Sequence, residues 1–349
     1  MSVAHADPVA RAAPASSPRR LPPALLLALA AVALLLVSLA SLAVGARPVP
    51  WSTLVEAWRH FDPANGDHAV IASRVPRTVV GLLAGSALGL AGAAMQGVAR
   101  NPLADPGLLG VNAGAALAVV VAMYVFGVTA VTGYIWFAFL GAGAAAVLVY
   151  SVASLGREGA TPVKLALAGA AVSAGCASLL SGILLTSRET LDAFRFWQVG
   201  SLSGRDWAVI APVAPFVAVG ALVALGTGRV LNGLALGDDL ARVLGQRVGL
   251  GRAVTALGVV VLCGAATALA GPMLFVGLVV PHLVRALVGA DYRWILPASM
   301  LLAPVLLVGA DVAGRVVLPP GEIQAGVMTA VVGAPVFIWL VRRGRQAQL

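Results

Sequence analysis

The sequence is dominated by long apolar runs that carry no charge, and the first of them extends from Leu21 to Gly45. It holds 25 residues, whereas an α-helix needs only about 20 to cross the hydrocarbon core of a bilayer. The apolar stretch of a secretory signal is shorter, at about 7–15 residues. We therefore predict that this run is a membrane-spanning helix and that lipid surrounds much of the protein.

The composition leads to the same expectation. Apolar residues make up 60% of the 349 residues and charged residues 11%, while a soluble domain has about 25% charged residues. The mean hydropathy is +0.96. Both cysteines, Cys176 and Cys263, lie inside apolar runs, so we expect two buried thiols rather than a disulfide or a thiolate metal site.

Ten apolar segments are long enough to be membrane-spanning helices. We expect them near residues 21–45, 76–98, 103–126, 132–155, 162–186, 207–228, 252–271, 273–290, 294–312 and 322–341. Backbone polar groups within lipid must be paired inside their own segment, which favours helices. The predicted fold is an all-α polytopic membrane protein. It would have a single transmembrane domain over 21–345 and, before it, a disordered cytoplasmic tail over 1–20 that is rich in alanine, proline and serine.

The distribution of charge predicts the orientation in the membrane. Ten spans place both termini on one side. If that side is the cytoplasm, fifteen of the 23 basic residues fall in cytoplasmic segments and eight in external ones. Such an excess is typical of cytoplasmic loops, so we expect cytoplasmic termini. Because the basic residues are scattered instead of forming a stripe, nucleic-acid binding is not expected.

The sequence shows no signature of catalysis. Lys164 is the only lysine and is not part of a G-x-x-x-x-G-K-[ST] motif, so the chain has no P-loop for ATP. One outer loop holds His60, Asp62, Asp67 and His68, which we interpret as a solvated polar loop rather than a metal site. No catalytic, cofactor or metal site is expected.

Ionisable residues are also missing from the middle of the predicted spans, and Asp311, near the end of one span, comes closest. A proton-coupled carrier usually needs such a group within the membrane. The energy for transport would therefore come from a partner. Gly85, Gly89 and Gly92 recur at spacings of four and three, which favours closely packed helices.

The longest cytoplasmic connection, at 229–251, contains a candidate helix of its own. Gly237 or Asp238 can cap it, and Leu240, Val243 and Leu244 would then share one face. An apolar face outside the bilayer has to be covered. The residues leave open whether the membrane domain, lipid headgroups or a cytoplasmic partner covers it.

Three arginines are expected at the outer side of the membrane. Arg74 and Arg77 flank Val75-Pro76 at the start of the second span, and Arg315 lies in the loop before the last span. Guanidinium groups at a pore mouth suit the recognition of carboxylates. Interfacial arginines that extend their charge toward water give the same pattern, and both interpretations stay open.

Short motifs in a fixed order give a further indication. They are Arg74-Val75-Pro76-Arg77, Gln96, Asn101-Pro102-Leu103-Ala104-Asp105-Pro106, Leu109-Gly110, Trp197, Gly200-Ser201-Leu202, Leu236–Gly245, Phe275-Val276-Gly277-Leu278, Pro281-His282, Arg285, Asp311, Arg315, Leu318-Pro319 and Gly333-Ala334-Pro335-Val336-Phe337. With these motifs the chain resembles the FecCD-type permeases, the membrane subunits of type II ABC importers for iron-siderophores, haem and cobalamin. Residues 1–20 and the 55–70 loop lie outside the resemblance.

The resemblance implies a permease of the bacterial cytoplasmic membrane that pairs with a second permease subunit, identical or paralogous. Two cytoplasmic ABC ATPase subunits would dock on a coupling segment formed by Leu236, Gly237, Asp238, Asp239, Leu240, Ala241, Arg242, Val243, Leu244 and Gly245. An extracytoplasmic substrate-binding protein would dock on Arg74, Arg77 and Arg315. ATP would be hydrolysed by the partner and not by this chain.

The cargo that the resemblance favours is a ferric siderophore, with haem and cobalamin as alternatives. A stand-alone secondary carrier is the competing class of protein. The lack of ionisable groups in the middle of the spans argues against that class.

Overall fold

The computed structural model of the protein describes residues 21–155, 161–319 and 321–346, and the tail expected at 1–20 lies outside them. The helices of the described part are α1 (Pro23–Ala43), α2 (Trp51–Arg59), α3 (Gly66–Ala99), the 3₁₀-helix η1 (Pro106–Leu109), α4 (Val111–Phe126), α5 (Val131–Ala153), α6 (Pro162–Thr186), α7 (Arg188–Gln198), α8 (Trp207–Gly226), α9 (Gly228–Ala235), α10 (Asp238–Val243), α11 (Val248–Ala270), α12 (Val276–Val288), α13 (Tyr292–Val317) and α14 (Ala325–Gln346). The described residues contain no strand.

Seven of these helices are long and apolar enough to cross a membrane, and three shorter apolar helices accompany them. The seven are α1, α3, α5, α6, α8, α11 and α13, and the shorter ones are α4, α12 and the first part of α14. These helices occupy the ranges read from the sequence. The prediction of an all-helical polytopic membrane protein is therefore confirmed.

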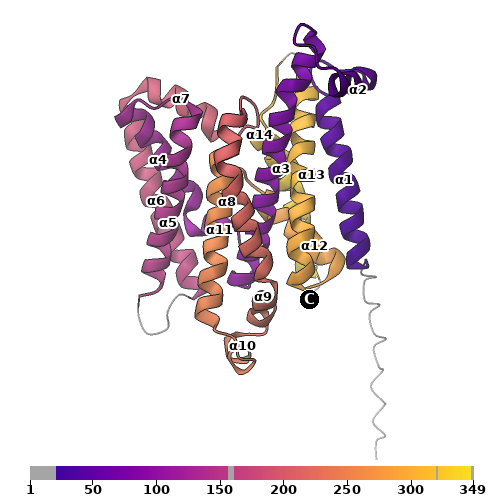
Figure 1. Ribbon diagram of the computed structural model, residues 1–349. Coiled ribbons are helices and arrows are strands. Elements are labelled where there is room, and N and C mark those ends of the chain that lie inside the picture. Colours follow the sequence, from indigo (N-terminus) through magenta and orange to yellow (C-terminus); the bar gives the residue numbers. More distant parts are fainter. Residues whose placement is uncertain (1–20, 156–160, 320, 347–349) are drawn as a thin grey trace, which may run out of the picture.

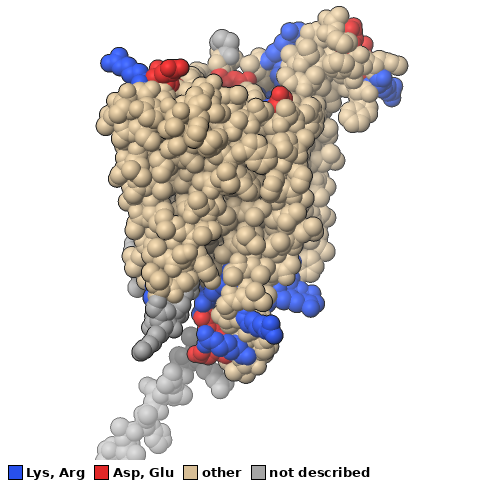
Figure 2. Space-filling model, turned by 60° about the vertical axis from the view of Figure 1, so that its left-hand side comes forward, with Lys and Arg blue, Asp and Glu red and all other residues tan. Residues whose placement is uncertain are grey.

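The helices run side by side and the bundle has two distinct ends (Figure 1). Helices α2 and α7 lie at the end drawn uppermost, which we call the outer end. Helices α9 and α10 lie at the opposite, inner end, together with the start of α1. Charged side chains gather at both ends and uncharged residues cover the surface between them (Figure 2), the pattern of a protein with lipid around its middle.

Helix α3 is the most buried of the long apolar helices, because its small residues let other helices approach closely. A Cβ atom added at Gly85 would overlap the backbone of Pro304, and one added at Gly89 would overlap the carbonyl of Ser299. Both neighbours belong to α13. The glycine face read from the sequence thus packs helix against helix, as is usual where lipid provides no hydrophobic driving force.

The second span starts earlier than the sequence predicts. We expect it from residue 76, but α3 begins at Gly66 because the Asn65 side chain accepts a hydrogen bond of 2.9 Å from the backbone N–H of Asp67 and caps the helix. Pro76 therefore lies inside α3 and not at its start. This extension adds about three turns at the outer end.

The third span starts later than predicted. Residues from about 103 are expected in it, but the Asp105 side chain accepts a hydrogen bond of 2.7 Å from the backbone N–H of Gly107. That bond caps η1 as a separate turn. Helix α4 follows from Val111.

Candidate functional site

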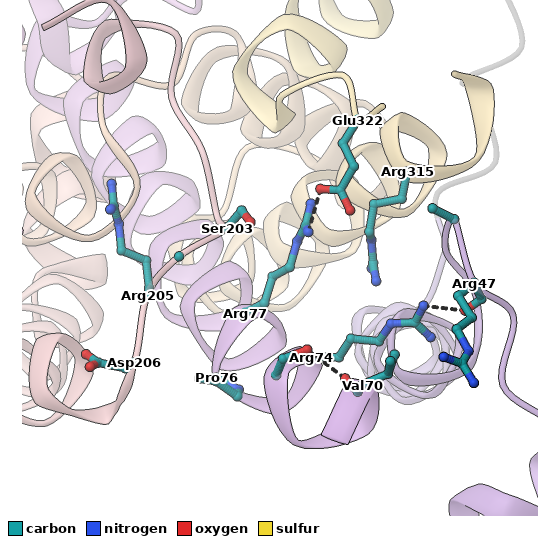
Figure 3. Close-up of a pocket in the computed structure, with 13 residues that line it drawn as sticks. Arg47, Val70, Arg74, Pro76, Arg77, Ser203, Arg205, Asp206, Arg315 and Glu322 are labelled. Atoms are coloured by element: carbon teal, nitrogen blue, oxygen red, sulfur yellow. Dashed lines mark hydrogen bonds and ion pairs between the residues drawn. The ribbon is translucent and has the colours of Figure 1, made fainter. Parts of the chain in front are cut away.

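A pocket of about 560 Å³ lies at the outer end of the bundle (Figure 3). Helices α3 and α13 and the segments before α2, α8 and α14 supply its charged side chains, which are Arg47, Arg74, Arg77, Arg205, Asp206, Arg315 and Glu322. Five guanidinium groups face two carboxylates there, so the lining carries a net positive charge near neutral pH. Such a lining favours an anionic ligand or partner.

Arg77 is the centre of the charge network in this pocket. Its Nε and Nη2 atoms donate to the carboxylate of Asp311 at 3.0 and 2.9 Å, and its Nη1 atom donates to Glu322 Oε2 at 2.7 Å. Figure 3 shows Glu322 reaching Arg77 from the segment before α14. One guanidinium group thus joins α3 to two parts of the chain far away in sequence.

Arg315 completes the network from α13. Its Nε atom lies 3.2 Å from Asp311 Oδ2, and its Nη1 and Nη2 atoms donate to the backbone oxygen (2.9 Å) and the hydroxyl (2.8 Å) of Ser41 at the end of α1. Asp311 is therefore neutralised from two sides. It is 1% exposed, and a buried carboxylate persists only when it is paired in this way.

Arg74 binds backbone oxygens instead of carboxylates. Its Nη1 atom donates to the carbonyl of Leu42 at 2.8 Å and its Nη2 atom to that of Arg47 at 2.6 Å. Residues three apart in a helix share a face, which explains why Arg74 and Arg77 enter the same pocket. The four-residue spacing of Asp311 and Arg315 does the same on α13.

The structure brings together the three arginines that the sequence assigned to docking, but it holds them below the surface. Arg74, Arg77 and Arg315 are 7%, 9% and 1% exposed, and each binds groups of the same chain. Glu322 and Arg205, which also line the pocket, were not identified from the sequence. Both lie in loops, and helical spacing gives no signal for loop residues.

The polar outer loop is held by its own side chains. His68 Nδ1 accepts a hydrogen bond from the backbone N–H of Asp62 at 3.0 Å, and Asp67 pairs with Arg47 at 2.6 Å. Among the described residues no group of three or more histidine, cysteine or acidic side chains is placed to hold a metal ion.

At the inner end, α9 and α10 lie in the connection between α8 and α11. Gly237 is the N-cap of α10 and has φ 107, and Gly245 after its end has φ 79. Side chains with a Cβ rarely adopt these left-handed conformations. The two glycines therefore set off a single short helix, close to where the sequence predicts one.

Helix α10 projects from the inner end (Figure 1), and the apolar side chains at its end are exposed. Leu240, Val243 and Leu244 are 56%, 83% and 63% exposed, whereas Ala241 is fully buried. No described segment of the chain covers these three side chains, so packing against the chain's own membrane domain is excluded for the described part. Exposed apolar clusters of this kind mark surfaces of interaction.

The sequence is similar to those of known transport proteins over most of its length. It is 46% identical over 310 residues to the ferric enterobactin transport system permease protein of Escherichia coli (strain K12), covering 89% of this chain and 92% of the relative. It is 41% identical to the iron(3+)-hydroxamate import system permease protein of Bacillus subtilis (strain 168), covering 88% and 80%. It is 34% identical to the hemin transport system permease protein of Yersinia pestis, covering 94% and 98%.

The fold also matches a solved structure. A metal-chelate-type ABC transporter in an inward-facing conformation superimposes with a TM-score of 0.81 at 28% identity, and the match covers 92% of this chain and 100% of that one. The fold is that of a transporter permease that spans the membrane many times. Residues 33–343 match the FecCD transport family. The chain belongs to this family.

Proposed function

We propose that the chain is the permease subunit of an ATP-driven ABC importer in a bacterial cytoplasmic membrane. It would pair with a second permease subunit, receive cargo from an extracytoplasmic binding protein and draw energy from two cytoplasmic ATPase subunits. Family membership and the likeness to a solved ABC transporter support this proposal. The observation that carries it is the uncovered apolar face of α10 at the inner end.

The ATPase would dock on the coupling segment from Leu236 to Gly245. Burial of Leu240, Val243 and Leu244 against a partner would remove apolar surface from water, at roughly 25 cal/mol per Å². Gly237 and Gly245 lie on either side of α10, so this helix can move as a short rigid unit. Docking there would transmit the ATPase cycle to the membrane helices, whose alternating packings open the path to one side or the other.

The binding protein would dock over the outer pocket, where Arg74, Arg77 and Arg315 create a positive potential. Their internal hydrogen bonds fix their positions, and acidic residues of a partner would be attracted by the surplus of guanidinium groups. Arg47, whose side chain is 64% exposed, extends this potential to the rim. Electrostatic complementarity of this kind mainly raises the association rate.

A ferric siderophore is the cargo we favour. The relatives with the higher identity are named for ferric enterobactin and iron(3+)-hydroxamate, and the one named for hemin has lower identity. Haem and cobalamin are the alternatives. Binding of ferric enterobactin, a ferric hydroxamate, hemin and cobalamin to the cognate binding protein, measured by fluorescence quenching, decides between them.

Co-purification with the cognate ATPase tests the coupling segment. Leu244→Glu places a charge in the proposed interface and should abolish co-purification, while the bundle keeps its thermal stability because Leu244 is exposed. Arg247→Glu, on an exposed residue just after the segment, is the matched control and should retain the ATPase. Full retention by Leu244→Glu would overturn the assignment.

A stand-alone secondary carrier is the second candidate, and Asp311 is the residue that bears on it. This buried carboxylate is paired with Arg77 and Arg315, so its charge is compensated within the chain. A carrier would need a group that gains and loses a proton during the cycle.

A further inference from the structure

The carboxylate of Asp238 links α10 to the membrane helices α3 and α11. Asp238, the first residue of α10, accepts hydrogen bonds from both terminal nitrogens of Arg252, from Nη1 at 3.0 Å and Nη2 at 2.9 Å. The same carboxylate forms an ion pair with Arg100. A forked pair of this kind fixes the direction between its partners as well as their distance.

The two arginines belong to different membrane helices. Arg252 lies in the first turns of α11 and its side chain is 11% exposed. Arg100 is the C-cap of α3, with φ 48, and is one of two described residues other than glycine with positive φ. Such a conformation persists where the surrounding structure holds it. Asp238 therefore meets the inner ends of two packed helices at once.

Its neighbour Asp239 makes no such link. Asp239 pairs with Arg242 within α10 at 2.8 Å, and its side chain is 97% exposed. Both aspartates suit the positive end of the helix dipole equally well, so the sequence does not distinguish them. In the structure one is a local surface pair and the other joins α10 to α3 and α11.

The other hydrogen bonds that hold α10 and the residues just after it, among the described residues, join groups that are close in sequence. Gln246 Nε2 donates to the carbonyl of Arg229 at 3.2 Å and its backbone N–H donates to that of Ala241 at 3.0 Å. These bonds shape the loop, but they hold it to α9 and not to the central helices. Leu240, Val243 and Leu244 face away from the bundle and are free for a partner.

Helix α3 extends from the ion pair of Arg100 with Asp238 at the inner end to the outer pocket. Arg100 lies at its inner end, and Arg77, which holds Asp311 and Glu322, lies near its outer end. A rigid helix transmits a displacement from one end to the other, because its backbone hydrogen bonds fix its length. A push on α10 would thus reach the pocket where the cargo is delivered.

We propose that Asp238 is a positioning residue that transmits the movement of α10 to α3 and α11 through Arg100 and Arg252. The proposal rests on the coupling role given to α10 above. Without the carboxylate of Asp238, the positive charges of Arg252 and Arg100 would repel each other. The pKa of the Arg100 guanidinium is already lowered, first by burial and then by the positive charge of Arg252. The inner ends of α3 and α11 would then separate from α10, and ATP hydrolysis would proceed without moving them.

Asp238→Asn tests the proposal, with Arg247→Gln, at an exposed residue just after the coupling segment, as the control. The assembled transporter is reconstituted in liposomes, and ATP hydrolysis is measured with and without the binding protein. The expected result is that Asp238→Asn loses the response to the binding protein by about fivefold or more, the lower limit of usual couplings between sites, while the ATPase still co-purifies. Arg247→Gln should respond like the wild type.

Arg252→Gln and the double variant Asp238→Asn/Arg252→Gln distinguish a loss of this contact from a general loss of stability. If Asp238 acts through Arg252, the double variant should lose no more of the response than Asp238→Asn alone, because residues in one network are not additive. A response of Asp238→Asn equal to that of Arg247→Gln would overturn the proposal, as would additive losses in the double variant.

The failure of this proposal can be told from the failure of the function. If Leu244→Glu loses the ATPase while Asp238→Asn responds normally, α10 is the docking segment but its movement takes another route. If Leu244→Glu keeps the ATPase, α10 is not the docking segment, and the transmission through Asp238 falls with it.

Discussion

Arg77 and Asp311 are 234 residues apart in sequence, yet the guanidinium of one binds both oxygens of the other's carboxylate. The pair joins the outer parts of α3 and α13, and Arg315 holds the same carboxylate from its other side. The network keeps two cations near the pocket and pairs both of them with carboxylates. It supplies positive potential and structural support with the same side chains.

Asp311→Asn should destabilise the bundle by about 3–5 kcal/mol, because it leaves the buried guanidinium of Arg315 without a counter-charge and that of Arg77 with Glu322 alone. Thermal unfolding in detergent checks this. Asp192→Asn is the control, since Asp192 and Arg195 form a pair with side chains 66% and 63% exposed, and such pairs contribute about 0–1 kcal/mol. Equal melting temperatures for the two variants would contradict the structural role of Asp311.

Gly92→Ala should also destabilise the bundle. A Cβ atom there would overlap the backbone of Gly277 at the start of α12, and overpacking of this kind costs about 1–3 kcal/mol. Gly143→Ala on α5 is the matched control, since a Cβ atom at Gly143 meets nothing within 4 Å. The control should melt no lower than the wild type. A neutral Gly92→Ala would mean that α3 and α12 are not in close contact.

Asp291 should make stability depend on acidity. Partial burial acts to raise the pKa of this carboxyl, but hydrogen bonds from Asn232 and the backbone N–H of Arg293 outweigh it and hold the pKa below its usual value of 3.8. The contribution is therefore present above that value and is lost as the pH falls through the lower, folded-state pKa. Asp291→Ala should remove an N-cap worth about 1 kcal/mol. Below pH 4 the melting temperature of this variant should depend less on pH than that of the wild type.

Delivery by the binding protein should be sensitive to salt. Raising the ionic strength from about 0.1 to 1 M shortens the Debye length from about 10 to 3 Å, so the association rate measured by surface plasmon resonance should fall. Arg74→Gln should slow association by about 2- to 10-fold, within the range usual for variants of one interface. Arg59→Gln, an exposed outer residue away from the pocket, should have no effect. An unchanged rate for Arg74→Gln would remove that residue from the docking surface.

The fold was largely predictable because its strongest signal is local. An apolar run near 20 residues determines a spanning helix by itself, and the ten expected ranges all contain helices. Helix starts were less predictable. Side-chain caps at Asn65 and Asp105 shifted two of them by several residues. The sequence alone does not indicate which of several nearby polar residues caps a helix.

The sites were predictable only in part, because their partners are distant in sequence. The exposed face of Leu240, Val243 and Leu244 follows from helical spacing. The contacts of Arg77 with Glu322, and of Asp238 with Arg252, depend on how separate helices and loops meet. No spacing rule predicts these contacts, so two aspartates that are adjacent in sequence, Asp238 and Asp239, have different partners in the structure.

We propose that this chain transports only together with a partner that hydrolyses ATP. The most direct measurement is uptake of radiolabelled ferric enterobactin, ferric hydroxamate or hemin into liposomes that contain the chain with or without its ATPase and binding protein. We expect uptake only with both partners and internal ATP, and none with the chain alone under a proton gradient. Uptake of any of these ligands by the chain alone, driven by the gradient, would contradict the account.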